Sequence, residues 1–338
     1  MAKYKDIGGT TVKFKSGSEE YTYPSGSEGS LFYNSANGQF EFVGLGTGVW
    51  SSGGNMNTAR RDAGGDGTQT ASWIAAGYHG SGPGLADEHE QYDGTSWTEA
   101  TDVNTARQAL TGAGTTTAAI VAAGSVPAVT DVTESWDGSS WTEVSDTNSG
   151  RNYRMGAGTS TAMLLVGGQP PQSANVELWD GSSWTETTDI NTARAAGAGA
   201  GTSTAMIIAN GILTVPSGNP QNLVEQWDGS SWTEVAELNA SHYGFLGGAG
   251  TSTEALVFGG GGGNSQEGTH YTTTESWNGT SWTEVADLAT GRGVGASAAS
   301  GPNTLTAVFG GSGGASPPYS AATEEWSFTH AIKTVTTS

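Results

Sequence analysis

The feature that most constrains this chain is a 13-residue segment, Val132–Val144 (VTESWDGSSWTEV), which recurs along the sequence. Close copies end at Thr187, Val235 and Val285, and a more divergent copy, HEQYDGTSWTEA, ends at Ala100. In each copy two β-prone runs flank an Asp-Gly or Asn-Gly corner, which is a strong short-range signal for a β-hairpin. The recurring segment therefore predicts one hairpin in every repeat.

Each predicted hairpin sets one aromatic residue opposite another when it closes at its Gly corner. The expected pairs are Tyr92/Trp97, Trp136/Trp141, Trp179/Trp184, Trp227/Trp232 and Trp277/Trp282. Such cross-strand pairs stabilise a sheet by up to ~1 kcal/mol each. Eleven of the twelve Trp residues occupy a repeated hairpin position, and only Trp73 does not. We therefore expect the tryptophans to form core rather than a cofactor site.

The complete repeat is longer than the hairpin. Its second Trp falls at positions 50, 97, 141, 184, 232 and 282, which gives spacings of 43 to 50 residues. Each unit holds an NTAR-like element, a small-residue run, an apolar run, a Gly pair and a variable loop before the hairpin. Four strand-like segments in a period of this length are typical of propeller blades. The Gly- and Ala-rich run suits the innermost strand, where blades crowd the axis.

The two ends of the repeat array complement each other. The last repeat ends at ATEEW, residues 322–326, without a W-T-E strand, and Trp50 has no partner strand before it. If Val49–Ser51 supplies the outer strand of the last blade, the ring closes and exposed sheet edges are removed. The sequence thus predicts an all-β fold: a six-bladed β-propeller over residues 46–328, with a small N-terminal β arm (1–45) and a C-terminal tail (329–338).

The predicted arm differs from the repeats in composition. It holds every Lys except Lys333, and its segment TVKFK alternates like a short strand. SLFYNSANGQFEF indicates a hairpin around Asn37-Gly38, with Phe32, Phe40 and Phe42 available for packing. The arm either packs on the main domain or is a docking segment that orders on a partner.

Gly pairs end the apolar run in three repeats, at Gly167-Gly168, Gly259-Gly260 and Gly310-Gly311, and an aromatic residue and a Trp follow at fixed places. On these residues, positions 46–328 resemble the kelch-repeat family of β-propellers. The pair is Ala123-Gly124 and Asn210-Gly211 elsewhere, and the usual Tyr of the third strand is mostly Trp. The recurring NTAR and GAGT motifs, together with the preceding SLFYN…GQFEF segment, resemble those of kelch-like structural and appendage proteins of marine bacteriophages.

The hairpin register also sets two glutamates opposite each other in five repeats: Glu90/Glu99, Glu134/Glu143, Glu177/Glu186, Glu225/Glu234 and Glu275/Glu284. Facing like charges destabilise a sheet unless something neutralises them. The candidates are the arginines of the NTAR slot, Arg60, Arg107, Arg151, Arg194 and Arg292, with His242 in that slot once. Because a guanidinium fork can bind two carboxylates, we expect a structural Arg–Glu network within or between blades. A ring of carboxylate Ca²⁺ sites is the alternative, although a feature repeated in every blade is more often structural.

Composition excludes several classes of function. The chain has no Cys, which removes disulfides, thiolate nucleophiles and Cys-bound metals. A formal net charge of −21 argues against nucleic acid as a partner, because a phosphate backbone would be repelled, and solubility is the plainer reason for such a charge. The start, MAKYKDIGG, indicates no signal peptide, and no apolar run approaches the ~20 residues that span a bilayer.

No combination of acid, base and nucleophile stands out, so we expect no enzyme and no cofactor. Five equivalent carboxylate pairs spread round a ring indicate scaffold rather than a glycosidase centre. The oxidases of the resembling family need a Cys-modified Tyr, which this chain lacks. A sialidase would need several arginines in one pocket, and only Arg61 and Arg154 lie off the repeat. The five His residues show no metal-ligand spacing.

The most divergent segments occupy one slot in each repeat, between its second and third strands: 78–89, 124–131, 169–175, 210–222, 260–271 and 311–321. They should therefore emerge on one face, and divergent loops on a rigid scaffold are how recognition surfaces are commonly built. Tyr78, His79, His270, Tyr271 and Tyr319 could stack on a glycan or insert into a protein groove. Plain tolerance of variation in exposed loops is the alternative.

Two functions follow as expectations. The first is a non-enzymatic virion protein, a head or tail fibre or decoration protein, assembled in the host cytoplasm. It would dock on other virion proteins, including copies of itself, through residues 1–45 and present its loop face to a host-surface glycan or protein or to a neighbouring subunit. The second is a cellular kelch-type interaction adaptor or glycan-binding lectin that uses the same loops.

Overall fold

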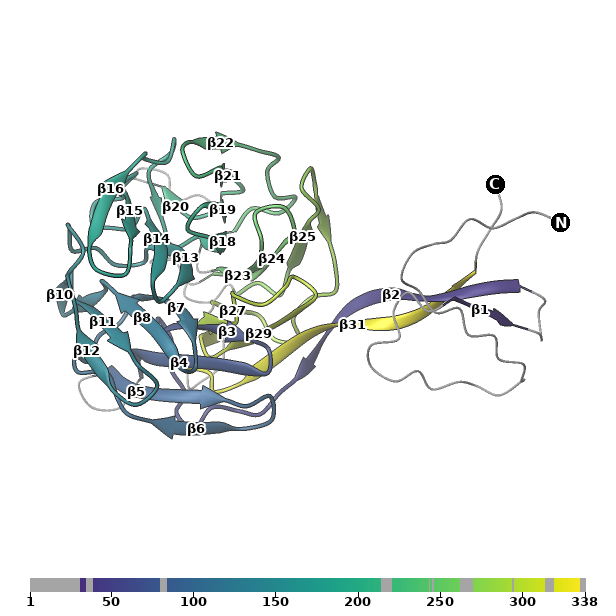
Figure 1. Cartoon of the computed structure of the whole chain (residues 1–338), viewed down its shortest axis with the longest axis horizontal. Coiled ribbons are helices and arrows are strands. Elements are labelled where there is room, and N and C mark those ends of the chain that lie inside the picture. The colour runs from purple at the N-terminus through teal and green to yellow at the C-terminus, as the bar shows by residue number, and fades with distance from the viewer. Residues whose placement is uncertain are drawn as a thin grey trace. The chain divides into compact units, whose positions relative to one another are not determined.

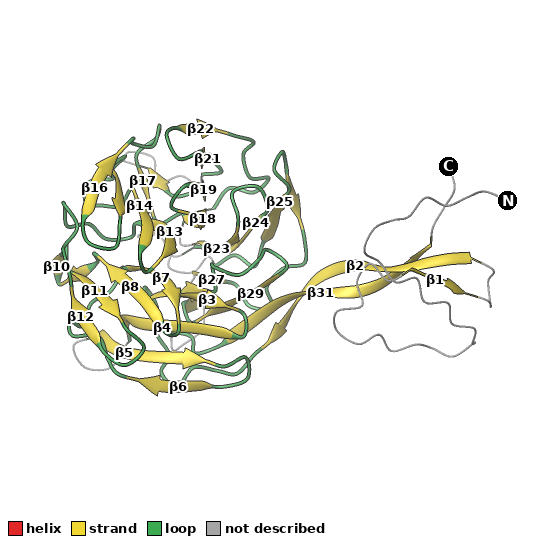
Figure 2. Ribbon diagram, in the orientation of Figure 1, coloured by secondary structure: helices red, strands yellow, loops and turns green. Residues whose placement is uncertain are grey.

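The computed structural model describes residues 31–34, 39–79, 84–213, 221–242, 244, 246–261, 270–293, 295–313 and 319–334. These residues form strands, turns and loops, without a helix (Figure 2), and so contain no helix able to cross a membrane. The chain divides into two compact units. The larger is Trp50–Ser327, and the smaller joins Met1–Val49 with Phe328–Ser338.

The larger unit is a six-bladed β-propeller, whose blades follow one another round an axis in chain order (Figure 1). Blade 1 consists of β3 (Gly64–Thr68), β4 (Ala71–Tyr78), β5 (Leu85–Tyr92) and β6 (Trp97–Ala100). Blade 2 consists of β7 (Thr111–Thr115), β8 (Ala118–Ala122), β11 (Thr133–Trp136) and β12 (Trp141–Glu143). Blade 3 consists of β13 (Met155–Thr159), β14 (Ala162–Val166), β15 (Val176–Trp179) and β16 (Trp184–Thr187).

Blade 4 consists of β18 (Ala198–Thr202), β19 (Ala205–Ala209), β21 (Val224–Trp227) and β22 (Trp232–Glu234). Blade 5 consists of β23 (Leu246–Gly250), β24 (Ala255–Gly259), β25 (Thr274–Trp277) and β26 (Trp282–Glu284). Three short two-stranded ladders lie among the loops. β9 (Ser125–Val126) and β10 (Ala128–Val129) pair within one loop, whereas β17 (Arg194–Ala195) pairs with β20 (Ile212–Leu213) and β27 (Arg292–Gly293) with β30 (Ser312–Gly313) between loops.

Blade 6 closes the ring with strands from both ends of the chain. It consists of β28 (Ala296–Ser297), β29 (Leu305–Phe309), β31 (Thr323–Thr334) and, outermost, β2 (Gln39–Ser52). The ring of Trp50 lies 5.4 Å from that of Trp326 and 5.0 Å from that of Phe258, and its Nε1 donates to Thr274 Oγ1 at 3.1 Å. The predicted fold class and its closure near residue 50 are therefore confirmed.

The innermost strands contact one another in a closed cycle, from β3 through β7, β13, β18, β23 and β28 back to β3. Small residues allow this close approach. A Cβ added to Gly199 would lie 2.8 Å from the carbonyl oxygen of Gly156 in the neighbouring blade. Asp66 ties the ends of the ring together, because its carboxylate accepts from Gly114 N and Ser300 N, both at 2.8 Å. The Gly- and Ala-rich runs thus lie at the axis, as their composition predicts.

The outer tryptophans form the core between blades. Trp136 pairs with Trp141 across its hairpin at 5.5 Å, in the predicted register. Trp141 also lies 5.9 Å from Trp73 of the preceding blade, and Trp97 lies 5.0 Å from Phe309 of the blade before it. All five of these aromatic side chains are buried. Each outer strand therefore attaches its blade to the previous one.

In the smaller unit, β1 (Leu31–Asn34) pairs antiparallel with β2, from Leu31 opposite Phe42 to Asn34 opposite Gln39. This is the hairpin that its sequence predicts, although its corner and the TVKFK segment lie outside the described residues. The expected tail, 329–338, begins as strand, because β31 continues to Thr334. Thr329 Oγ1 donates to Thr47 O at 3.1 Å, so pairing beside β2 extends the strand beyond the last repeat.

Candidate functional site

The NTAR elements and the variable loops lie on one face of the propeller, which we call the loop face. NTAR elements connect the outer strand of one blade to the inner strand of the next, and the variable loops connect the second strand to the third. In a four-stranded antiparallel blade both kinds of connection leave the sheet at the same end. The pairing confirms it in three blades, where Arg61 bridges Tyr78, Gln108 bridges Ser125 and Asn152 bridges Gln169.

The facing glutamates are in the expected register in all five hairpins. Their environments differ, however. Glu134 of the third strand is fully buried, whereas Glu143 opposite it in the outer strand is exposed, and the other pairs repeat this pattern. Only one carboxylate of each pair therefore requires a partner inside the protein. In the described ion pairs each arginine contacts the inner carboxylate of its hairpin, and the outer carboxylate stays exposed.

Five buried glutamates form ion pairs with buried arginines. Arg60 Nη2 lies 2.9 Å from Glu90 Oε1, Arg194 Nη1 lies 2.8 Å from Glu225 Oε1, Arg292 Nη2 lies 2.5 Å from Glu324 Oε1, and Arg107 contacts Glu134. The fifth pair is in blade 3. Burial lowers the pKa of Arg60, Arg194 and Arg292, while the adjacent carboxylate raises it in each case. Each pair is an intra-blade link between the NTAR element and the third strand.

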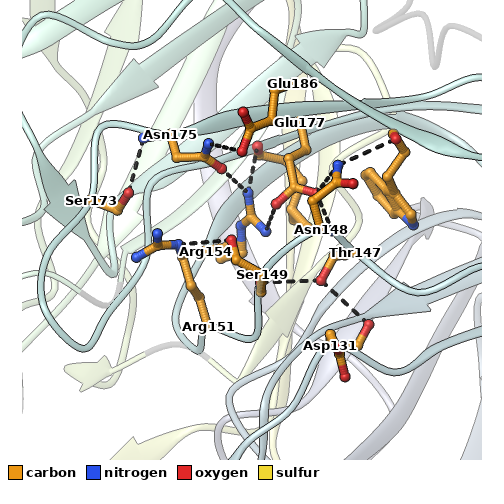
Figure 3. Close-up of polar contacts among 12 residues, drawn as sticks. Asp131, Thr147, Asn148, Ser149, Arg151, Arg154, Ser173, Asn175, Glu177 and Glu186 are labelled. Atoms are coloured by element: carbon orange, nitrogen blue, oxygen red, sulfur yellow. Dashed lines mark hydrogen bonds and ion pairs between the residues drawn. The ribbon is translucent and has the colours of Figure 1, made fainter.

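Blade 3 uses a different arginine from the one that the repeat predicts (Figure 3). Arg154 Nη1 lies 2.7 Å from Glu177 Oε1, while Arg151 turns to Ser149 Oγ at 3.3 Å. Arg154 Nη2 also donates to Asn175 Oδ1 at 3.4 Å, and Asn175 Nδ2 donates to the outer Glu186 at 3.0 Å. The alignment of repeats misplaces the cation by three residues, because the long side chain of Arg154 reaches the same carboxylate from the next turn of the loop.

The Asn of the NTAR element has a role that sequence reasoning missed. Asn104 N and Nδ2 donate to Glu134 Oε2 at 2.7 and 2.9 Å, and Nδ2 also donates to Trp141 O at 2.9 Å. Asn57, Asn148, Asn191 and Asn239 make the corresponding backbone contact in their blades. We call the buried glutamate with these amides and its cation the carboxylate clamp. Recurrence of Asn three residues before Arg was the available signal. Glu324 was also missed, because its repeat lacks a facing glutamate.

Blade 5 has His242 in place of the arginine. Its buried ring lies against Tyr271, with centroids 4.6 Å apart and planes nearly perpendicular. Burial lowers the pKa of His242, although Glu275 raises it. Glu275 accepts from Asn239 N, Asn239 Nδ2 and Ala240 N at 2.9, 2.7 and 2.9 Å. Among the described residues no group of His, Asp and Glu side chains is arranged to hold a metal ion, so the alternative of Ca²⁺ sites gains no support.

The five predicted recognition residues fall into two groups. Tyr78 and Tyr319 lie together, with ring centroids 5.8 Å apart, and the guanidinium of Arg61 lies 5.4 and 5.6 Å from the two rings. His79 is on the same side of the ring, where its Nε2 lies 3.5 Å from Glu88. Arg61 is the residue of this cluster that was not predicted as a binding residue.

The second group is at blades 5 and 6. His270 Nε2 lies 3.1 Å from Ser312 Oγ, which belongs to the next blade. Tyr271 packs on His242 in the clamp of its own blade. Tyr271 is therefore at least partly structural, and the Arg61, Tyr78 and Tyr319 cluster is the better candidate for recognition.

A cavity of about 140 Å³ lies at the propeller axis, lined mainly by Gly and Ala of the innermost strands. Asp62 and Tyr153 line it from the loop face, and Tyr153 OH donates to Asp62 Oδ2 at 3.4 Å. Burial raises the pKa of the Asp62 carboxyl, and the adjacent Arg61 opposes this shift with its Nε 3.4 Å from Oδ2. Burial also raises the pKa of Tyr153. Arg61 thus links the cavity to the aromatic cluster.

These features define a closed β-propeller in which non-repeated polar side chains, Arg61, Asp62 and Tyr153 among them, meet at the loop face. No known protein family and no curated protein matches the chain. Among solved structures, the chain is similar to one titled "Structure of YjhT", with a TM-score of 0.62 and 14% identity, over 83% of this chain and 99% of that one. At this identity the likeness supports the fold alone.

Proposed function

We propose that the chain is a non-enzymatic recognition protein of a bacteriophage virion. In this proposal the smaller unit docks on other virion proteins, and the loop face of the propeller meets the host surface or a neighbouring subunit. The observation that carries the recognition role is the division of polar groups. The buried repeated charges are paired in the carboxylate clamps, whereas non-repeated groups (Arg61, Asp62, Tyr78, Tyr153 and Tyr319) contact one another on the loop face.

The clamps argue for a scaffold rather than a reaction centre. A catalytic carboxylate must reach substrate, but Glu134 and its equivalents are buried beneath the NTAR element. Their acceptor sites are filled by arginine, asparagine and backbone amides. A constellation repeated in every blade is what a ring of similar modules needs for stability.

Charge separation supports docking through the smaller unit. Residues 50–327 contain 28 of the 33 acidic residues and all seven arginines, so they carry the whole formal charge of −21. The remaining residues contain five acids and all five lysines and are neutral. A strongly acidic propeller stays soluble and repels its copies. A neutral unit containing both chain ends suits attachment to another protein. The resemblance of the repeats and lead-in to phage appendage proteins makes that partner a virion component.

The test is incorporation into particles. Mass spectrometry of purified virions should detect the chain, and deletion of residues 1–45 should abolish incorporation. That deletion keeps Trp50 and the part of β2 from Gly46 to Ser52 that belongs to blade 6, so near-ultraviolet circular dichroism should stay native. Absence of the chain from virions would contradict the proposal. Incorporation of the truncated chain at the full-length level would remove docking through the arm.

A cellular adaptor or lectin is the second candidate, favoured by the Arg61, Tyr78 and Tyr319 cluster, since aromatic rings beside a few fixed polar groups are typical of ligand sites. It predicts a chain absent from virions that nevertheless binds a cellular glycan or protein through the loop face. Substitution of Tyr319 by Ala should then weaken capture of that ligand.

A further inference from the structure

We propose that the loop-face end of the axial cavity binds the terminal residue of a neutral glycan, a hexose, held by Asp62 and Tyr153 inside the mouth and by Arg61 at its rim. This inference rests on the proposed recognition role of the loop face and specifies its ligand.

The mouth of the cavity includes a partial ring of hydrogen-bonded backbone from four blades. Ala109 N donates to Asp62 O at 2.6 Å, Tyr153 N donates to Ala109 O at 2.9 Å, and Ala196 N donates to Tyr153 O at 2.8 Å. These residues hold equivalent positions in four successive blades, and all have positive φ, from 52° to 59°. A site built on such a ring is preorganised, so binding costs little conformational entropy.

Only two of these equivalent positions carry functional groups. Ala109 and Ala196 leave space, whereas Asp62 and Tyr153 supply a carboxyl and a phenol that line the cavity. The Asp62 side chain is 8% exposed, and its contacts with Arg61 Nε and Tyr153 OH are both 3.4 Å long. A buried carboxylate normally has short hydrogen bonds that repay its desolvation. Its remaining acceptor capacity at a cavity mouth suits a ligand that brings hydroxyl donors.

The size of the cavity limits the ligand. About 140 Å³ is the volume of about five water molecules. Pockets for drug-sized ligands and cofactors are roughly 300–1,000 Å³, so a nucleotide or folded peptide is too large. One pyranose ring entering from the loop face is of suitable size, with the rest of the glycan outside.

Charge and shape favour a neutral sugar. Asp62 and Arg61 form an ion pair, so the described residues of the mouth offer no unbalanced cation to an acidic sugar, and the propeller as a whole carries −21. Adjacent sugar hydroxyls can donate to the Asp62 carboxylate and accept from the Arg61 guanidinium. Tyr78 and Tyr319, beside Arg61, supply aromatic surface against which the next sugar can lie.

The experiment is titration calorimetry of the full chain with methyl α-glucopyranoside, methyl α-mannopyranoside and methyl β-galactopyranoside, with glucuronate as the acidic probe. At least one neutral glycoside should bind, and glucuronate should bind at least tenfold more weakly. Asp62→Asn should weaken binding at least tenfold, and Tyr153→Phe or Tyr319→Ala several-fold. Arg151→Ala, which removes the one arginine that forms no ion pair among the described residues, should leave affinity unchanged. Since burial raises the pKa of Asp62, the neutral Asn variant should fold at least as stably as the wild type.

No binding of any neutral glycoside would overturn the inference, and so would equal affinity of Asp62→Asn and the wild type or preference for glucuronate. The failure of the inference can be told apart from failure of the proposed function. If particles carrying Asp62→Asn adsorb normally to the host, the loop face can still be the recognition surface, but the proposed glycan is not its ligand. If the chain is absent from virions but still binds a glycoside, the proposed virion role is wrong and the proposed sugar site stands.

Discussion

Blades 2 and 5 both bury a glutamate of the third strand, but they place different residues in the arginine slot beside it. In blade 2, Arg107 contacts Glu134, and its Nε donates to Ala123 O at 3.2 Å. In blade 5 the side chain of His242 is buried, and burial lowers its pKa below its ordinary value, so it is neutral at pH 7. Glu275 is nevertheless buried. The amides of the NTAR element are thus the shared part of the clamp, and the cation is replaceable.

The space left by the shorter side chain is filled from the same blade. Tyr271 packs its ring on His242, four residues before Glu275. The equivalent residue in blade 2, four residues before Glu134, is the much smaller Thr130. The exchange of Arg for His therefore accompanies an exchange of a small residue for Tyr, which keeps the interior filled.

Replacing the residue in the arginine slot should give the largest difference in stability between the two blades. Arg107→Met keeps the aliphatic volume but leaves Glu134 as an unpaired buried charge, so the free energy of unfolding should fall by about 3–5 kcal/mol. His242→Met removes no charge at pH 7 and should cost about 1 kcal/mol, from packing. Urea unfolding of both variants measures the difference. Equal losses would show that the ion pair is not what distinguishes the blades.

Blade 3 gives an effect of similar size with an internal control. Arg154→Met should cost about 3–5 kcal/mol, because Arg154 holds Glu177. Arg151→Met should cost less than about 0.5 kcal/mol, since Arg151 is partly exposed and its side chain hydrogen-bonds only to Ser149 in the described structure. Thermal unfolding of the two variants measures both losses. A larger loss for Arg151→Met than for Arg154→Met would show that Arg151, the arginine that the repeat predicts, is the structural one.

Acid should destabilise the contact between blades 1 and 2 through His89. Burial among Trp73, Trp136 and Trp141 lowers the pKa of His89 to about 4. Because the unfolded chain binds this proton first, stability is lost as the pH falls from about 6.5 to about 4, by up to ~3 kcal/mol. His89→Thr introduces the residue found at the equivalent Thr323, whose hydroxyl accepts from Trp97 Nε1 at 3.0 Å. The variant should lose less stability than the wild type between pH 7 and pH 4.5, and an identical pH profile would exclude His89 as the cause.

A smaller effect tests whether His242 and Tyr271 are coupled. The double variant His242→Arg with Tyr271→Thr recreates the blade 2 combination and should gain about 1 kcal/mol from a charge-assisted bond to Glu275. Each single variant should be less stable than the wild type, the first from crowding and the second from a cavity. A double-mutant cycle by urea unfolding measures the coupling. Additive effects would show that the two exchanges are independent.

Most of the fold could be predicted from the sequence because the Gly corners, the Trp pairs and the repeat period are signals that can be read along the chain. The Gly pair shows how the structure refines such a signal. Its first position has φ of 62° at Ala123 and 67° at Gly167, and non-Gly residues adopt this left-handed region at modest cost. Its second position has φ of 108° at Gly124 and 103° at Gly168, which effectively requires Gly. The apparent loss of the pair in some repeats is therefore confined to the tolerant position.

The candidate site was harder to predict, because it depends on distances across the ring. Tyr78 and Tyr319 were recognisable as loop aromatics, yet they are 241 positions apart in the sequence, and only ring closure brings them to Arg61. Asp62 and Tyr153 face each other across the axis from different blades. The identity of the cation in blade 3 likewise depends on side-chain reach rather than on register. The repeat pattern predicts features that all blades share, whereas the candidate site consists of residues that occur in single blades.

Hydrogen exchange of the wild-type protein tests the clamp most directly. Asn104 N and Thr105 N donate to Glu134, and Asn239 N and Ala240 N donate to Glu275. If the cation determines how firmly each carboxylate holds its amides, the blade 2 pair should exchange more slowly than the blade 5 pair at pH 7. Equal protection, or slower exchange in blade 5, would contradict a stabilising role of the cation in the clamp.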